Sequence, residues 1–205
     1  MKDHWETVYQ QKRPDGVSWY QPHLNLSLTL LERSGLHQHS HVIDVGGGTS
    51  TLVDDLLGRG LTHVTVLDLS HHALAAAKAR LGDRASAVHW MEADITQATL
   101  PDGAYDLWHD RAVFHFLTSA ADRQRYRTIM TNALTPTGHV ILATFSLQGP
   151  PRCSGLDVVR YSPDTLQGEL GTGFRLMEAR DEAHRTPFNT VQAFIYCRFQ
   201  RVSNL

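Results

Sequence analysis

The chain has 205 residues, of which 41% are hydrophobic, which is enough for one α/β domain with a sizeable core. Its formal net charge is −2 with histidine taken as neutral, which argues against a nucleic-acid surface because such a surface needs a basic stripe. No apolar run approaches the roughly 20 residues of a membrane span, and the first residues lack a signal-peptide pattern. The composition therefore predicts a soluble, cytoplasmic protein without a nucleic-acid or membrane partner.

Histidine and cysteine are common metal ligands, but here they form no ligand pattern. The sequence has 13 histidines and two cysteines, and the cysteines are far apart. The alternating histidines at 37–41 and the pair at 71–72 have no further ligand nearby in the sequence. The sequence therefore predicts no metal site.

The N-terminal part is expected to be helical. Residues 1–22 are polar with several aromatic side chains, and a short helix is expected from 3 to 11. A second helix is expected from 25 to 33, because leucines fall on one face and Ser34-Gly35 ends the pattern. The aromatic residues of the first segment are Trp5, Tyr9, Trp19 and Tyr20.

From residue 41 to residue 145, short apolar runs alternate with amphipathic ones. This alternation predicts a parallel sheet with helices on both faces. The expected strands are 41–45, 63–67, 86–91, 105–109 and 139–145. The expected helices are 50–58, 70–81, 111–117 and 119–133.

The pattern changes after residue 145. A loop is expected up to residue 160, and then a helix that Ser162 caps. Two long strands follow at 174–183 and 190–199. Because their connection is short, they should pair antiparallel.

The run from Val42 to Ser50 is the most informative part of the chain. It has the pattern of a buried strand, three glycines and the start of a helix. Such a turn lets a ligand lie against bare backbone, and the helix N-terminus offers unpaired N–H groups. No lysine follows the glycines, which excludes a P-loop, and the third glycine of a dinucleotide site is absent. The turn therefore indicates a nucleotide-like ligand, with a glycine turn that binds nothing as the alternative.

Acidic residues close or flank four of the predicted strands, namely Asp44, Asp68, Asp94 and Asp110. Asp68 follows the glycines by about 20 residues, the distance at which an acidic residue meets ribose hydroxyls. A carboxylate accepts both hydrogen bonds of a cis-diol, so the chemistry suits this role. Asp68 could instead cap the following helix together with Ser70.

The spacing Asp44-x-Gly46-x-Gly48-x-Ser50 resembles motif I of the class I S-adenosylmethionine (SAM)-dependent methyltransferases, with Ser50 in place of the last glycine. The resemblance implies a three-layer, Rossmann-like α/β fold in a single domain over residues 1–205. Its sheet would have seven mostly parallel strands and an antiparallel C-terminal strand. The resemblance also implies SAM as cofactor and S-adenosyl-L-homocysteine as product. The cofactor-binding residues that it implies are Trp19, Asp44, Gly46, Gly48, Ser50, Asp68, Leu69, Asp94, Ile95 and Asp110.

A narrower likeness concerns Asp110-Arg111 and the later Arg-x-Arg-Tyr at 123–126. These segments are similar to ones in thiopurine methyltransferase-like and related small bacterial methyltransferases. In that subgroup an aromatic N-terminal segment lies over the bound cofactor. The likeness therefore implies that residues 1–35 form a helical cover over the cofactor and substrate site.

Methyl transfer from SAM needs an aligned nucleophile and a dry site, because the sulfonium already carries an excellent leaving group. Asp110, Arg111 and His115 are the candidate catalytic residues. At helical spacing His115 would share a face with Arg111 and deprotonate a substrate, or it could simply pack between Phe114 and Phe116. Arg111 could hold an anionic substrate, or it could pair with a neighbouring aspartate.

Tyr20 and Cys153 are expected to contact the substrate besides Arg111 and His115. Trp19 and Tyr20 could close over the sulfonium by cation–π attraction, or they could only pack on the core. Cys153 lies in the loop after the fifth strand, where it could bind a soft metalloid acceptor or be an ordinary loop cysteine.

The combined prediction is an enzyme that transfers a methyl group from SAM to a small-molecule acceptor. A soft sulfur, selenium, tellurium or arsenic nucleophile is one option for that acceptor. The alternatives are a protein lysine methyltransferase of the same fold and a SAM-binding protein without turnover. The missing third glycine disfavours a dinucleotide-dependent oxidoreductase. We expect a monomer or a weak dimer.

Overall fold

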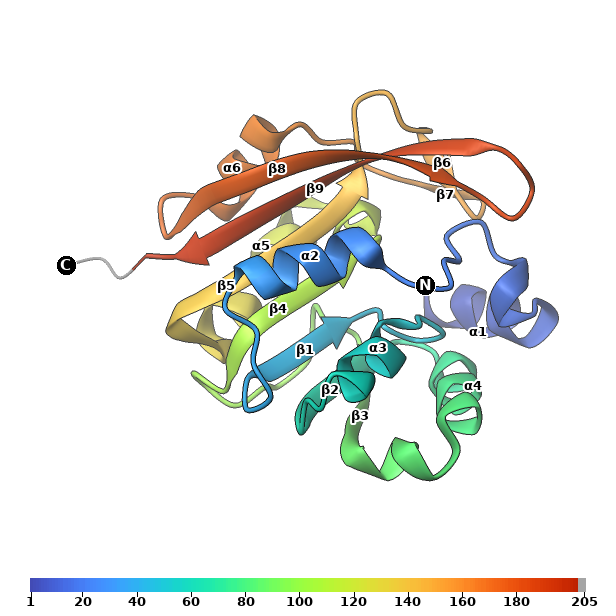
Figure 1. Cartoon of the computed structure of the whole chain (residues 1–205). Coiled ribbons are helices and arrows are strands. Elements are labelled where there is room, and N and C mark those ends of the chain that lie inside the picture. The colour runs from blue at the N-terminus through green and yellow to red at the C-terminus, as the bar shows by residue number, and fades with distance from the viewer. Residues whose placement is uncertain (203–205) are drawn as a thin grey trace.

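Seven strands form the central sheet of the computed structural model, which describes residues 1–202 (Figure 1). They are β1 (His41–Val45), β2 (His63–Asp68), β3 (Val88–Glu92), β4 (Tyr105–Arg111), β5 (Leu134–Phe145), β8 (Phe174–Arg185) and β9 (Val191–Arg201). Their order in the sheet is β3-β2-β1-β4-β5-β9-β8. β9 pairs antiparallel with β5 and β8, and the other pairs are parallel. The predicted mostly parallel sheet with an antiparallel C-terminal strand is thereby confirmed.

Helices cover both faces of this sheet, so the molecule has three layers (Figure 1). On one face lie α2 (Asn25–Arg33), α3 (Leu52–Gly58) and α4 (His71–Leu81). On the other face lie α5 (Ala120–Ala133) and α6 (Pro163–Leu170). The first helix, α1 (Lys2–Gln11), lies next to α4, beyond the carboxyl end of β1.

The strands are apolar on both sides because both faces of the sheet are covered. Neighbouring residues of a strand point to opposite faces. In β1, Val42 joins the apolar cluster of α2 and α3, whereas Ile43 joins that of α5 and α6. In β4, Leu107 and Trp108 divide in the same way. This two-sided burial explains the continuous apolar runs that indicate the strands in the sequence.

The carboxyl ends of the parallel strands meet at one edge of the sheet. Val45 at the end of β1 lies beside Leu67 of β2 and beside Asp110 of β4. Asp68 pairs with Glu92 at the end of β3. The glycine turn and the acidic strand ends therefore converge on the edge where ligands of such sheets bind.

The predicted helix at residues 111–117 is wrong. β4 continues to Arg111, Ala112 has a φ of 71°, and only one 3₁₀ turn follows, η3 (Phe114–Phe116). The left-handed conformation of Ala112 interrupts any helix at that point. The Asp110 carboxylate accepts backbone N–H groups of this turn, so the chain folds back over the strand end.

Some element boundaries also differ from the prediction. β5 begins five positions earlier, at Leu134, and a 3₁₀ helix, η2 (Gly82–Ala87), precedes β3. The predicted loop after β5 contains a small hairpin of β6 (Arg152–Cys153) and β7 (Leu156–Asp157). The other predicted helices and strands are confirmed, with ends that differ by at most two residues.

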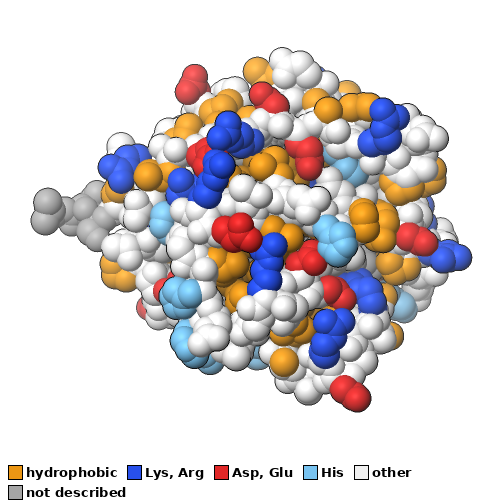
Figure 2. Space-filling model, in the orientation of Figure 1, with side chains coloured by type: hydrophobic (Ala, Val, Ile, Leu, Met, Phe, Trp, Pro, Cys, Tyr) orange, Lys and Arg blue, Asp and Glu red, His pale blue; other side chains and the backbone are white. Residues whose placement is uncertain are grey.

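The surface in Figure 2 mixes acidic and basic side chains, and neither sign gathers into a stripe on this face. Over residues 1–202, no helix is both long and apolar enough to cross a membrane. The same residues hold no group of three or more His, Cys, Asp and Glu arranged for a metal ion. Cys153 and Cys197 are free thiols, and both are buried.

Candidate functional site

The glycine turn after β1 has no room for side chains. Gly46 has a φ of 69°, and its N–H donates to the Leu67 carbonyl at 2.7 Å. A Cβ atom at Gly46 would overlap the side chain of Val113. One at Gly48 would lie 2.5 Å from Asp68 Oδ2. Bare backbone therefore lies against both the end of β2 and the turn after β4.

Asp68 stands at the end of β2 and is only 6% exposed. Its Oδ1 accepts the Ser70 N–H at 2.8 Å, so the carboxylate does cap the turn into α4. Burial raises the pKa of Asp68 to about 7, and the N–H groups of Ser70 and Gly48 offset part of this rise. Asp68 therefore changes its charge near neutral pH.

A cavity lies between these strand ends and the N-terminal segment, and we call it the main cavity. Its apolar walls include Trp5, Phe116 and Leu117. Tyr9 from α1 also lines it. The predicted site residues that line it are Trp19, Gly46, Asp68, Leu69, Asp94, Ile95, Arg111 and Cys153.

Asp94 follows β3 and lines the main cavity. Its Oδ1 accepts the N–H of Thr96 at 2.9 Å and the hydroxyl of the same residue at 2.7 Å. Its Oδ2 has only a long contact with Gln97 Nε2, at 3.4 Å. The local turn therefore fixes the carboxylate at the cavity wall and leaves Oδ2 available to a donor.

A second hollow, the side cavity, adjoins the main cavity at the glycine turn. The two share Tyr9, Trp19, Gly46 and Arg111. The remaining predicted residues that line the side cavity are Tyr20, Asp44 and Ser50. Three of the motif I residues, Asp44, Gly46 and Ser50, thus line the side cavity, and Gly48 is not among the described lining of either cavity.

A buried line of three polar side chains fixes Asp44. Asp44 Oδ1 lies 2.7 Å from His109 Nδ1, and His109 Nε2 lies 2.8 Å from Ser27 Oγ. Ser27 is fully buried in α2, so this line is a structural tie between helix and sheet rather than a nucleophile with its base. Asp44 Oδ2 is buried without a hydrogen-bond partner among residues 1–202. Neither His109 nor Ser27 can be assigned to Asp44 from the sequence, because both lie far from it along the chain.

Asp110 is not among the described residues that line either cavity. Its Oδ1 accepts the Val113 N–H at 2.9 Å, and its Oδ2 accepts the Tyr126 hydroxyl at 2.6 Å. Burial raises the pKa of Asp110 to about 6, although these hydrogen bonds act in the opposite direction. Both oxygens of Asp110 thus have partners within the fold, and its predicted catalytic and cofactor contacts stay a prediction.

His115 is fully buried and also lies outside the described lining of both cavities. Its ring packs 4.5 Å from that of Phe116 and 4.7 Å from that of Phe145, measured between centroids. Nδ1 accepts the Phe145 N–H at 3.3 Å, and burial lowers the pKa of His115 to about 3. The packing alternative is therefore the one observed. The helical spacing to Arg111 does not exist.

Arg111 lines both cavities, with 6% of its side chain exposed. Its Nε donates to the Tyr196 hydroxyl and its Nη1 to the Trp19 carbonyl, both at 2.8 Å. The guanidinium also lies over the Phe194 ring. Nη2 lies 3.8 Å from Glu182 and has no hydrogen-bond partner within residues 1–202. The acidic neighbour of Arg111 is thus Glu182 and not one of the aspartates near it in sequence. The Nη2 group of Arg111 donates no hydrogen bond within the described structure.

The N-terminal cover is narrower than predicted. α2 packs on the sheet, so within residues 1–35 only positions up to Leu24 line the cavities. Trp5 stands edge-on to Phe116 with centroids 5.1 Å apart. Cys153 of β6 lies in the same wall, and burial raises its pKa to about 11.

Comparison with known sequences gives a family for the central part of the chain. Residues 42–138 match the methyltransferase domain family. The eEF1A lysine and N-terminal methyltransferase of Mus musculus is 24% identical over 139 residues, which is 68% of this chain and 20% of that protein. An uncharacterised methyltransferase of Mycobacterium bovis is 29% identical over 104 residues, 51% of this chain and 50% of that protein. The chain therefore spans half or less of the length of these relatives.

Solved structures share the fold. The N-methyltransferase NodS of Bradyrhizobium japonicum, in complex with S-adenosyl-L-homocysteine, has a TM-score of 0.74 at 16% identity, covering 98% of this chain and 100% of NodS. A structure from work on the conversion of a disulfide bond into a thioacetal group during echinomycin biosynthesis has a TM-score of 0.77 at 21% identity, covering 100% and 93%. At such identities the likeness establishes the fold. The narrower likeness to thiopurine methyltransferases stays a prediction.

Proposed function

We propose that this chain, which carries a class I SAM-dependent methyltransferase domain, transfers the methyl group of SAM to a small-molecule acceptor in the main cavity. The observation that carries the proposal is the position of Asp68 beside the bare glycine turn, at one wall of that cavity. A carboxylate next to backbone without side chains suits a ribose diol and the atoms attached to it.

The residues of the two cavities fit the two ends of SAM. Asp68 would accept the ribose hydroxyls, and Asp94 would accept the adenine amino group with its free oxygen. Leu69 and Ile95 would contact the purine. The buried, unpaired Asp44 Oδ2 suits the α-ammonium group of the methionine moiety, because a buried acceptor needs a donor.

Three further residues of motif I would act through their position. Gly46 lines both cavities and leaves the space between them open. Ser50 adds a hydroxyl to the side cavity. Gly48 would act indirectly, because a side chain there would displace the Asp68 carboxylate.

When bound, SAM supplies a methyl group on a sulfonium, which is already activated for transfer. The task of the chain is then to hold the acceptor in line with that methyl group and to exclude water. The aromatic walls formed by Trp5, Tyr9, Trp19 and Phe116 suit both tasks. An aromatic face also attracts a sulfonium by cation–π interaction.

The cavity chemistry favours an acceptor that needs no protein base. Among the described residues that line the main cavity, the ionisable side chains are Tyr9, Asp68, Asp94, Arg111 and Cys153. Burial holds the pKa of Tyr9 well above its usual range and that of Cys153 at about 11, so neither is a base at neutral pH. With the two aspartates assigned to the cofactor, the acceptor has to present its own lone pair. A thiolate, selenide or similarly soft nucleophile meets this condition.

Arg111 is the group that would orient the acceptor. Its unpaired Nη2 suits a carboxylate or another anionic group of a small molecule. Cys153 would remain a neutral thiol at the same wall, so it would contact the acceptor as an apolar group. This makes Cys153 a poor ligand for a metalloid, because the thiolate is the ligand form.

Methylation of a protein lysine is the second candidate, since one relative is named for that activity. It is less favoured for two reasons. A lysine amine has to lose its proton before transfer, and no lining side chain in the described structure is suited to take it. Trp5 of α1 also packs against Trp19 and Phe116, and these aromatic walls narrow the space that a protein side chain would have to enter.

Calorimetric titration with SAM and with S-adenosyl-L-homocysteine tests the cofactor. We expect micromolar or tighter binding of both, and absence of binding would overturn the proposal.

A panel of thiols, selenols, arsenite and amines, scored by S-adenosyl-L-homocysteine release, tests the acceptor. Thiols with a carboxylate should be better acceptors than their esters. Binding without release across the panel would favour a SAM-binding protein without turnover.

A further inference from the structure

α1 forms a wall of the main cavity although it is itself poorly buried. None of its ten described residues is fully buried. Trp5 and Tyr9 nevertheless face inward, with ring centroids 5.8 and 6.2 Å from that of Trp19. The position of this helix therefore depends strongly on its polar contacts.

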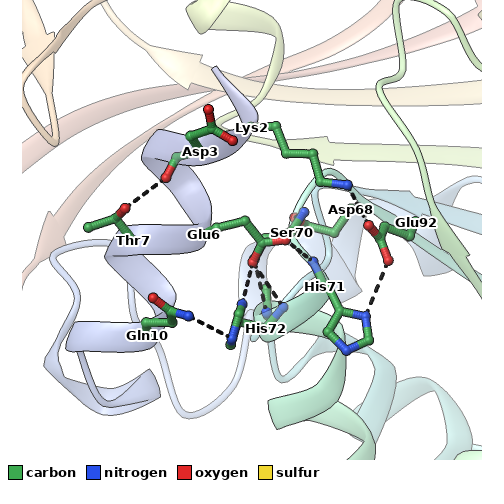
Figure 3. A network of polar contacts seen from close by, with 11 residues as sticks. Lys2, Asp3, Glu6, Thr7, Gln10, Asp68, Ser70, His71, His72 and Glu92 are labelled. Atoms are coloured by element: carbon green, nitrogen blue, oxygen red, sulfur yellow. Dashed lines mark hydrogen bonds and ion pairs between the residues drawn. The ribbon is translucent and has the colours of Figure 1, made fainter.

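Glu6 makes the main polar contact of α1, and its partners lie at the start of α4 (Figure 3). Its Oε1 accepts the His71 N–H at 2.8 Å. Its Oε2 accepts the Ser70 hydroxyl at 2.8 Å and the His72 N–H at 3.2 Å, and lies 2.6 Å from His72 Nδ1. One carboxylate thus joins three consecutive residues of another element.

A carboxylate at the N-terminus of α4 stabilises this helix. The first N–H groups of a helix lack intrahelical partners, and the helix dipole favours a negative charge there. Ser70 caps only the Ala73 N–H, at 3.2 Å. Burial alone would raise the pKa of Glu6, but hydrogen bonds from His72, Ser70 and the backbone hold it at about 2. Glu6 is therefore ionised at neutral pH and supplies the acceptor that α4 otherwise lacks.

Ser70 connects this contact with the cofactor site. Its hydroxyl donates to Glu6, and its N–H donates to Asp68 Oδ1 at 2.8 Å. The proposed ribose carboxylate and the carboxylate of α1 are thus bonded to the same residue. A movement of α1 would therefore be transmitted to Asp68, the proposed ribose ligand, through the single residue Ser70.

Only two exposed residues, Lys12 and Arg13, connect α1 to the 3₁₀ helix η1 (Pro14–Gly16). Residues 12–15 are exposed, whereas the segment 17–21 is held at several backbone carbonyls. The side chains that hold it are Arg111 on Trp19, His184 on Ser18 and Thr51 on Gln21, at 2.8, 2.7 and 2.9 Å. When α1 leaves its place, Trp5 and Tyr9 lose their contacts with Trp19, but these three hydrogen bonds still hold the backbone of the segment 17–21.

We infer that α1 is a lid that opens about residues 12 and 13 to exchange SAM for its product, and that Glu6 is the positioning residue that holds it shut on α4. Closure brings Trp5 and Tyr9 to the acceptor side at the same time as it completes the hydrogen bonds around Ser70. The ligand in this inference rests on the proposed function. The contact of Glu6 with α4 is observed in the structure and does not depend on the proposed function.

The test compares Glu6→Ala and Glu6→Gln with Asp3→Asn. Asp3→Asn removes the same charge from the same helix, at a carboxylate without a hydrogen bond in residues 1–202. Amide hydrogen exchange of residues 2–11 is measured in the ligand-free protein. Dissociation of S-adenosyl-L-homocysteine is followed by tryptophan fluorescence. We expect Glu6→Ala to raise both the exchange rate of residues 2–11 and the dissociation rate of S-adenosyl-L-homocysteine about tenfold. Glu6→Gln should lie between, since its amide oxygen still accepts, and Asp3→Asn should match the wild type.

Two results would overturn the lid. One is exchange of residues 2–11 in Glu6→Ala at the wild-type rate. The other is a rise in exchange rate that spreads evenly over the sheet, because this would mean that Glu6 only stabilises the fold as a whole. Failure of the wild type to bind SAM or its product would instead refute the proposed function. The exchange measurement on the ligand-free protein separates these cases.

Discussion

Asp68 and Asp110 end strands on either side of β1, and both are buried, yet their surroundings differ. Asp68 lines the main cavity and has one oxygen bonded to its own turn. Asp110 bonds one oxygen to the turn after β4 and the other to Tyr126. An acidic strand end is therefore a candidate for ligand binding where its carboxylate lines a cavity and is not bonded to another side chain.

The largest expected effect is a loss of stability in Asp110→Ala. The change leaves the Tyr126 hydroxyl and the N–H groups of the turn buried without an acceptor. We expect the free energy of unfolding to fall by about 3 kcal/mol, measured by urea denaturation. Asp68→Ala is the matched control and should lose less than about 1 kcal/mol. Equal losses in the two variants would remove the distinction between the two carboxylates.

The next effect concerns affinity. Asp68→Ala should weaken SAM binding about 100-fold, because two hydrogen bonds to a charged acceptor are lost. Titration calorimetry at a temperature where the variant is folded measures this. Tyr126→Phe removes a bond to Asp110 instead and should change the affinity less than about threefold. A similar loss in Tyr126→Phe would mean that both strand ends serve the ligand.

A smaller effect is the dependence of affinity on pH. The pKa of Asp68 in the free protein is raised to about 7, so its carboxyl is largely protonated below that value. Both ribose hydroxyls need an ionised acceptor, so the affinity for S-adenosyl-L-homocysteine should rise with pH from 6 to 8, by roughly tenfold. Asp68→Asn should flatten this dependence. A wild-type affinity that is constant over the range would show that Asp68 is already ionised.

The smallest effect is on the stability of the free protein. The pKa of Asp68 is about 7 when folded, against a reference value of 3.8, so the folded state favours the protonated form. The stability that this gives is complete below about pH 4 and is lost as pH rises to about 7. Relative to Asp68→Asn, the wild type should therefore lose about 1 kcal/mol between pH 6 and pH 7. Urea denaturation at several pH values measures it, and a gain with rising pH would contradict the assigned shift.

The parts of the site that the sequence predicts are local. The strand, the glycines and the cap at Ser70 obey rules that act over a few residues, and Asp68 stands at a spacing set by the strand–turn–helix–strand unit. The covered faces of the sheet likewise follow from apolar runs. These features are found because each one is complete within a short window of sequence.

The parts that the sequence does not predict depend on partners far along the chain. Asp44 meets His109 across 65 positions, and Glu6 meets Ser70 across 64. Residues 111–117 have a helical pattern, but Asp110 and the left-handed Ala112 turn the chain back. His115 is thereby moved from an expected cavity wall into the core. A tertiary contact decides each of these cases, and local sequence propensities carry no information about such a contact.

The contacts that hold the segment 17–21 have a consequence for synthesis. Gln21 bonds to Glu182 and His184, and the carbonyl of Ser18 accepts from His184, so this segment depends on residues that follow it by 161 to 166 positions. Contacts between segments so distant in sequence form late in folding. A nascent chain that still lacks β8 and β9 also lacks the side chains that hold Ser18, Gln21 and Arg111 beside the two cavities. We therefore expect productive binding of SAM only after β8 has been made and has folded onto the sheet.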